Sequence, residues 1–170
     1  MYFILFIKCT LINNINKMDN SSDIYLQYKS KLQKDGLYLK YIEDQTDELC
    51  SIAVNECGLA IKFVKKQTKD LCIQAINNFP FAIKYIKEPT EELNILAVQK
   101  YGMALESIKN PSEEVCREAV HQTAYAIKYI ENPSEEVKKL AKLSYAVSSY
   151  DDMIWRQFIE FEFKIICNLK

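Results

Sequence analysis

The sequence predicts an all-α fold, a solenoid-like stack of 22-residue repeats that each contain two helices. Three columns of residues, each recurring at every 22nd position, predict this fold. The first holds a hydroxyl residue, at Thr46, Thr68, Thr90, Ser112 and Ser134. The second holds a branched aliphatic residue, at Leu49, Leu71, Leu93, Val115 and Val137. The third holds alanine, at Ala53, Ala75, Ala97, Ala119 and Ala141. Because self-similarity at a fixed period is the signature of stacked repeats, these columns indicate one repeat domain.

Residues 1–17 precede the repeats, and we expect them to be loosely attached. The run from Met1 to Ile12 is apolar, but Lys8 interrupts it, no cationic segment precedes it, and no small-residue cleavage site follows. A secretory signal is therefore not predicted, and the run is too short to span a bilayer. Two interpretations of the start stay open, translation from Met1 or from Met18.

The repeat domain is expected over residues 18–150, with degenerate copies at both ends. Residues 23–35 resemble a first helix that carries Leu26 and Leu32. A second, short helix follows, containing Gly36, Leu39, Tyr41 and Ile42. At the far end, Lys138 and Lys142 replace apolar residues of the repeat, and Ser148 and Ser149 replace the Ala-Ile pair of the short helix. Polar end copies are what a stack needs in order to stay soluble.

Full copies are expected over residues 46–132, each with a long helix of about 12 residues and a short one of about 8 residues. The hydroxyl residue can cap the first turn of the long helix, and acidic residues follow it there. A break comes after the long helix, at Gly58, Pro80 or Gly102. Glycine suits a left-handed helix cap and proline a first helical position. The fourth copy has Ala124 instead, and we expect that junction to run more nearly continuous.

Residues 151–170 leave the repeat and become strongly apolar, and we interpret them as a capping helix or tail. One interpretation is a terminal element packed on the last copy, and the other is a partner-binding tail. The tail contacts would then be made by Trp155, Phe158, Phe161 and Phe163.

The segment PTEELNILAVQKYGMALESIKNPSEEVCREAVHQTAYAIKYIENPSEEV resembles a known array. It is similar to the repeats of an uncharacterised domain-of-unknown-function family abundant in mimivirus-type giant viruses of amoebae. Those repeats run as T-E-E-L-C-x-x-A-V and then G-x-A-L-K-Y-I-K-N, and this chain departs from them at Asn94 and Ser107. The resemblance covers residues 36–146 and implies a helical repeat fold in a viral protein made in the host cell. It implies no activity.

Nothing in the composition or motifs predicts an enzyme, a cofactor or a metal site. Cys50, Cys72 and Cys116 share one repeat position, as small buried hydrophobic residues do, and no C-x-x-C spacing exists. His121 is the only histidine, and its side chain diverges from that of Cys116, because the two lie about 140° apart around the helix axis. We therefore expect a non-enzymatic protein in a reducing compartment, the cytoplasm.

Two surface rows remain for a function. The first is a row of polar residues on the long helices, Asn55, Asn77, Gln99 and His121, which we take as the candidate partner contact. The second is a row of lysines, Lys40, Lys62, Lys84 and Lys128, broken by Glu106 and accompanied by Lys65, Lys87 and Lys109. We expect its charges to be neutralised by the acidic starts of the long helices. The prediction is an interaction scaffold for an unknown protein partner. The alternative is an RNA-binding repeat protein, which the net charge of −1 disfavours.

Overall fold

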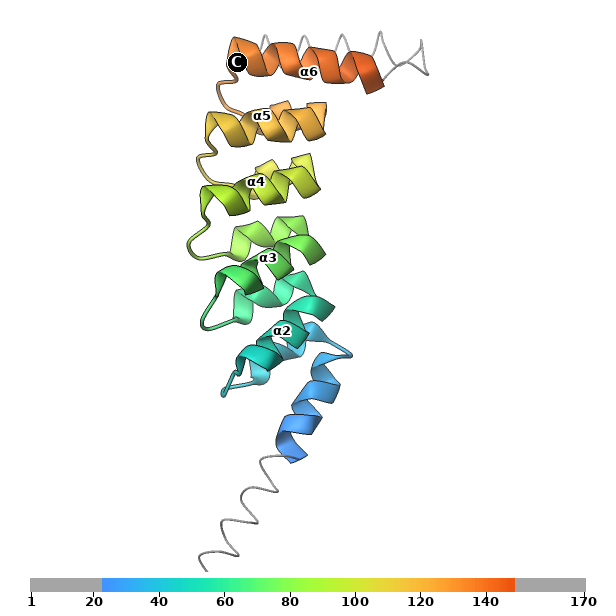
Figure 1. Ribbon diagram of the computed structural model, residues 1–170, viewed down its shortest axis with the longest axis vertical. Coiled ribbons are helices and arrows are strands. Elements are labelled where there is room, and N and C mark those ends of the chain that lie inside the picture. The colour runs from blue at the N-terminus through green and yellow to red at the C-terminus, as the bar shows by residue number, and fades with distance from the viewer. Residues whose placement is uncertain (1–22, 149–170) are drawn as a thin grey trace, which may run out of the picture.

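The computed structural model describes residues 23–148, which form one continuous stack of helices (Figure 1). The order of elements after a helix over residues 23–32 is η1 (Gly36–Tyr41), α2 (Asp47–Glu56), η2 (Gly58–Phe63), α3 (Lys69–Asn78), η3 (Pro80–Tyr85), α4 (Glu91–Lys100), η4 (Gly102–Ser107), α5 (Glu113–Gln122), η5 (Ala124–Tyr129) and α6 (Glu135–Ser148). No strand occurs between residues 23 and 148, so the predicted all-α repeat fold is confirmed. The predictions for residues 1–17 and 151–170 lie outside the described residues.

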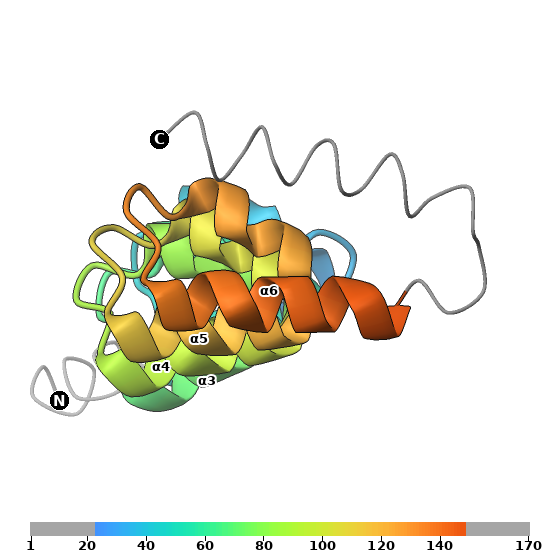
Figure 2. The same cartoon turned by 90° about the horizontal axis from the view of Figure 1, so that it is seen from above.

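Each repeat consists of an α-helix of 10 residues, one extended residue, a 3-10 helix of 6 residues and a short loop. Both helices are shorter than predicted, and the second has the tighter 3-10 winding. The repeats stack so that each α-helix packs on the next α-helix and each 3-10 helix on the next 3-10 helix. Seen down the stack, the α-helices lie along one side and the 3-10 helices along the other (Figure 2). The molecule therefore has an α layer and a 3-10 layer.

The hydroxyl column caps the α-helices as predicted. Thr46 accepts a hydrogen bond from the Leu49 N–H at 3.3 Å, and each later repeat forms the same bond. The hydroxyl thereby satisfies one of the free N–H groups of the first turn. Acidic residues follow in the first turn of every α-helix from α2 to α6.

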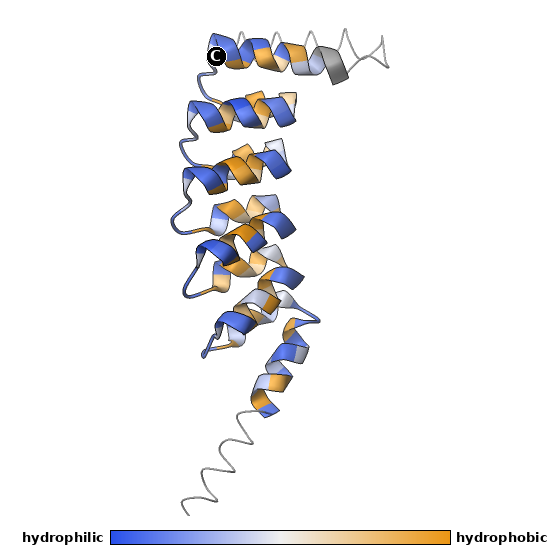
Figure 3. Cartoon of the chain, viewed as in Figure 1, coloured by the Kyte–Doolittle hydropathy of each residue, from blue (hydrophilic) through white to orange (hydrophobic). Residues whose placement is uncertain are grey.

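The core lies between the two layers and repeats with the same period. All five alanines of the predicted column are fully buried, and the aliphatic column is at most 5% exposed. The 3-10 helices add a second fully buried alanine column, Ala60, Ala82, Ala104 and Ala126. Hydrophobic and hydrophilic segments alternate along each helix (Figure 3), and every buried residue between positions 23 and 145 is apolar or glycine. Small residues at fixed places let neighbouring helices approach closely.

The glycines do not form the left-handed caps that we predicted. The α-helices end at a single extended residue such as Cys57, with φ of −145° and ψ of 110°, and no glycine of the described chain has positive φ. Gly58 is instead the first residue of η2, where a Cβ would lie 2.6 Å from the Ala75 carbonyl oxygen of the next repeat. Close approach of the next α-helix, not backbone handedness, requires glycine there. The first position predicted for Pro80 is confirmed in η3.

The prediction that the helices of the fourth copy run nearly continuously through Ala124 is wrong. Thr123 is extended and separates α5 from η5, as in every other copy. The helix that does run on is α6, which has 14 residues and passes the place where earlier copies break. The 3-10 helices pack on the α-helix of the following repeat, and no repeat follows α6 in the described part of the chain. Up to residue 148, α6 occupies the positions at which a second short helix would begin.

The first helix matches the prediction only in part. It spans residues 23–32, and Leu32 is fully buried, but Leu26 is 60% exposed. Leu32 thus anchors the helix, and the half-buried Tyr25 and Tyr28 also pack against the core. Across residues 23–148, none of the helices is both long and apolar enough to cross a membrane.

Candidate functional site

The predicted polar row lies on the α layer. Asn55, Asn77, Gln99 and His121 are all exposed, and each is the residue before the last in its α-helix. Stacking brings them into one row, and their side chains form no hydrogen bonds within residues 23–148. This row is therefore free to contact a partner.

The residues next to this row have a structural role. The Asn78 amide accepts a hydrogen bond from the Gly58 N–H at 2.7 Å and donates one to the Asn55 carbonyl oxygen at 2.8 Å. The Gln122 amide accepts the corresponding bond from the Gly102 N–H at 2.7 Å. In these two repeats, an amide at the last position of the α-helix joins the repeat to the previous one.

Exposed aromatic side chains gather on the 3-10 layer, which the sequence analysis did not predict. Of the large hydrophobic residues that are exposed in the described chain, every aromatic one lies in a 3-10 helix or directly before one. These are Tyr41, Phe79, Tyr85, Tyr101 and Tyr125, between 38% and 64% exposed. A detectable signal was present, because the last residue of the 3-10 helices reads Tyr41, Phe63, Tyr85, Ser107 and Tyr129. Concentrated aromatic exposure of this kind is typical of interaction surfaces.

The predicted lysine row lies beside these rings. The Lys40 Nζ is 4.6 Å from the centroid of the Tyr41 ring. The Lys62 Nζ is 4.7 Å from the Phe63 ring and 5.8 Å from the Tyr85 ring of the next repeat. At these distances an ammonium group is attracted to the face of the ring. We define the aromatic–lysine face as Lys40, Tyr41, Lys62, Phe63, Lys84 and Tyr85.

A similar arrangement recurs in η5. The Lys128 Nζ lies 4.3 Å from the Tyr125 ring and 4.7 Å from the Tyr129 ring. The hydroxyl of Tyr129 beside it raises the pKa of Lys128, which further favours the charged form of the ammonium group. Between these two regions the pattern stops, because η4 carries Glu106 and Ser107 at the matching positions.

The acidic starts of the α-helices do not neutralise the lysine row, contrary to our prediction. Within residues 23–148, the salt bridges of these carboxylates join them to other side chains of the α layer, as in Lys69–Glu92 and Arg117–Glu136. None of them reaches the lysine row. Of the accompanying lysines, Lys65 donates to the Glu43 carbonyl oxygen at 2.7 Å, and Lys87 to the Lys65 carbonyl oxygen at 3.0 Å. These two join loops of adjacent repeats.

The cysteine column is buried, as predicted. Burial raises the pKa of the Cys50 and Cys72 thiols, and burial together with the Glu113 carboxylate raises that of Cys116 to about 11. A thiol is a nucleophile only when deprotonated, so these groups are unreactive at neutral pH. Over residues 23–148 no cluster of histidine, cysteine and acidic residues has the geometry to hold a metal ion.

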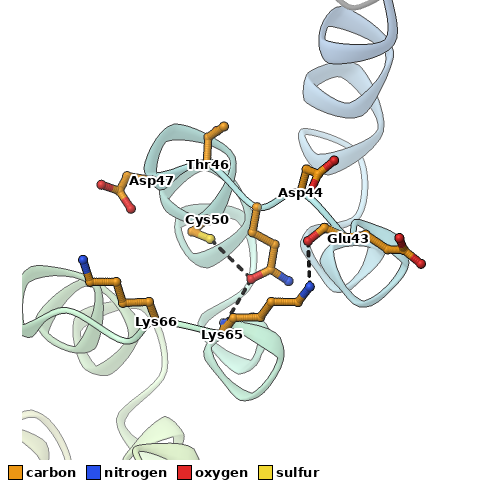
Figure 4. Close-up of a pocket in the computed structure, with 8 residues that line it drawn as sticks. Glu43, Asp44, Thr46, Asp47, Cys50, Lys65 and Lys66 are labelled. Carbon is orange, nitrogen blue, oxygen red and sulfur yellow. Dashed lines mark hydrogen bonds between the residues drawn. The ribbon is translucent and has the colours of Figure 1, made fainter.

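A pocket of about 340 Å³ opens where the loop after η1 meets the loop after η2 (Figure 4). Gln45 holds the two loops together, donating to the Phe63 carbonyl oxygen and accepting from the Lys65 N–H, both at 3.0 Å. Asp44, Asp47 and Lys66 line the rim. The pocket is lined by residues of both charges, and its only thiol is that of the buried Cys50. We interpret it as the space where two loops meet.

No protein-family model matches the chain, and the comparisons with curated proteins and with solved structures found no match. The resemblance to the giant-virus repeat family therefore stays a prediction. The candidate tail contacts Trp155, Phe158, Phe161 and Phe163 lie outside the described residues. Two surfaces remain as candidates, the polar row on the α layer and the aromatic–lysine face on the 3-10 layer.

Proposed function

We propose that the protein is a non-enzymatic scaffold that binds a protein partner through its 3-10 layer. The observation that carries the proposal is the gathering of the exposed aromatic residues on that layer. Aromatic side chains contribute a large contact area at a small cost in conformational entropy and dominate many interfaces. The resemblance of the repeats adds the proposal that the protein acts in the cytoplasm of an infected host cell.

The choice of face rests on a difference between the two candidate surfaces. The polar row offers one polar side chain per repeat, an amide in three repeats and an imidazole in the fourth, and little apolar area. The 3-10 layer combines exposed rings with unpaired lysines, the mixture of apolar anchors and polar groups that an interface needs.

A peptide-display selection on the immobilised full chain tests the proposal. One variant replaces Tyr41, Tyr85, Tyr101 and Tyr125 by serine. The matched control variant replaces the polar row Asn55, Asn77, Gln99 and His121 by serine. Circular dichroism and thermal melting establish that both variants stay folded.

We expect peptides that bind the wild-type chain and the polar-row variant but not the aromatic variant. Peptides that bind the aromatic variant and fail on the polar-row variant would move the binding site to the α layer. A selection that enriches no peptide over the uncoated support would contradict the scaffold function itself.

A further inference from the structure

The outer surface of the 3-10 layer carries two parallel stripes. A 3-10 helix has about 3.0 residues per turn, so side chains three residues apart lie directly above one another. One stripe is apolar and consists of Leu37, Leu59, Phe81, Met103 and Tyr125. The other is the lysine row, three residues further along each helix. A partner lying along the layer therefore meets apolar and cationic side chains in every repeat from η1 to η3.

The lysines of this layer have no anionic partner within residues 23–148. Lys40, Lys62 and Lys84 are exposed, and the contacts of Lys40 and Lys62 with aromatic rings hold their ammonium groups close to the surface. Cations fixed at a partly apolar surface attract carboxylates more strongly than freely moving ones. The charge of this face thus calls for an acidic partner.

The spacing of the lysines limits the shape of that partner. Packed helices lie about 8–10 Å apart, so consecutive lysines repeat at about that interval. A polyproline II helix has about 3 residues per turn and rises about 3.1 Å per residue, which places every third residue on one side at about 9 Å intervals. An extended β-strand alternates its side chains with a period of 2, so of three carboxylates spaced three residues apart the middle one would point away from the lysines.

We infer that the aromatic–lysine face binds an acidic, proline-rich segment in the polyproline II conformation, with a carboxylate at every third residue. The carboxylates contact Lys40, Lys62 and Lys84, and the prolines between them pack on the apolar stripe and on Tyr41 and Tyr85. Aromatic surfaces recognise such segments because the segment is already ordered and loses little entropy on binding. The inference rests on the proposed scaffold function and names its partner class.

The face also has a defined end. Glu106 and Ser107 replace lysine and tyrosine in η4, so a carboxylate of the partner would meet a like charge there. Three consecutive lysines match a segment of about seven residues. A variant carrying Glu106→Lys and Ser107→Tyr would extend the face by one repeat.

Fluorescence anisotropy with the full chain tests the inference. The probe is a labelled nine-residue peptide, Glu-Pro-Pro repeated three times. Its controls are Gln-Pro-Pro repeated three times, a peptide of the same composition with its three glutamates adjacent, and a nine-residue oligouridylate. The last control is needed because aromatic rings and lysines also bind single-stranded RNA.

We expect the Glu-Pro-Pro peptide to bind at least about tenfold more tightly than the glutamine peptide, as three exposed ion pairs of ordinary strength allow. The variant K40Q/K62Q/K84Q should lose about the same factor. The matched control K34Q/K100Q/K139Q removes three exposed lysines elsewhere and should bind normally. A twelve-residue Glu-Pro-Pro peptide should bind the E106K/S107Y variant more tightly than the wild-type chain.

Equal binding of the glutamate and glutamine peptides would overturn the inference, as would equal losses in the two triple-lysine variants or tighter binding of the oligouridylate. These outcomes differ from failure of the scaffold function. Display selection could yield peptides that need the exposed tyrosines while the Glu-Pro-Pro peptide does not bind. The inference of an acidic, proline-rich partner would then be wrong, and the proposed scaffold function would be supported. If the selection yields none, both proposals fall.

Discussion

At the scale of single residues, contacts between repeats decide which side chain each position accepts. Gly58 and Gly102 begin their 3-10 helices against the last turn of the next α-helix. A Cβ would lie 2.6 Å from the Ala75 carbonyl oxygen in the first case and 2.5 Å from the Ala119 carbonyl oxygen in the second. Backbone atoms in a packed helix cannot move aside as the end of a long side chain can.

Gly58→Ala should therefore destabilise the protein by about 1–3 kcal/mol through overpacking. Urea denaturation followed by circular dichroism measures the free energy of unfolding. The matched control is Ala124→Gly, which removes a methyl group at the same repeat position and should cost less than about 1 kcal/mol. A neutral or stabilising Gly58→Ala would show that the next helix yields, because alanine also lowers the entropy of the unfolded chain.

Asn94 places a polar side chain in a column of otherwise apolar residues. It occupies the position of Cys50, Cys72 and Cys116, and its Oδ1 atom is buried with no hydrogen-bond partner in the described chain. A buried acceptor without a donor loses its hydration and gains nothing in return.

Asn94→Cys should thus stabilise the protein by about 1 kcal/mol and raise its melting temperature. The reciprocal change Cys72→Asn should destabilise it by at least as much, because it buries an amide in place of a thiol. Thermal melts of both variants at one protein concentration provide the comparison. A lower melting temperature for Asn94→Cys would mean that the amide has a stabilising role.

At the scale of elements, the α-helices follow from their sequences and the 3-10 helices do not. A hydroxyl cap, acidic first-turn residues and a ten-residue apolar pattern identify each α-helix without tertiary information. The six residues of η2 span two turns, too few to separate a period of 3.0 from one of 3.6. The lysine row and the aromatic column beside it were readable from the sequence. The exposure of the rings was not, because the neighbouring repeats decide which side of a short helix faces solvent.

The break after each α-helix also depends on the neighbouring repeat. The residue pair at the break is Thr123 and Ala124 in the fourth copy and Tyr145 and Ala146 in the last one. Both pairs lack glycine and proline, yet only the first breaks. In the fourth copy η5 packs on the following α-helix, α6, a contact that no local pattern reports.

The hydroxyl caps give a test at this scale. Thr68→Ala should cost about 1 kcal/mol, because it leaves the Leu71 N–H without its side-chain acceptor. Thr123→Ala is the matched control, since Thr123 precedes η5 but caps no N–H of that helix, and it should cost less. Equal losses in the free energy of unfolding would assign the effect to the removal of a threonine and not to capping.

At the scale of the whole molecule, each repeat is stabilised by its own contacts and by those with the adjacent repeats. Each element contacts its own repeat and the adjacent ones, so the stack is nearly one-dimensional. In such proteins the loss of one interface weakens nearby repeats first and distant repeats least. The partner proposed above would also extend along the stack, because each of its carboxylates would contact the lysine of a different repeat.

Ala97→Leu tests this organisation in the middle of the stack. Ala97 is fully buried in α4, and the three heavy atoms that leucine adds cannot be accommodated between α3 and α5, so a loss of about 1–3 kcal/mol is expected. Hydrogen exchange followed by mass spectrometry should show faster exchange in α3, α4 and α5 and nearly unchanged exchange in α2. Ile95→Leu, at a partly exposed position of the same helix, is the control and should change neither. A uniform increase in exchange from α2 to α6 would mean that the stack opens only as a single cooperative unit, in which case distant repeats share one stability.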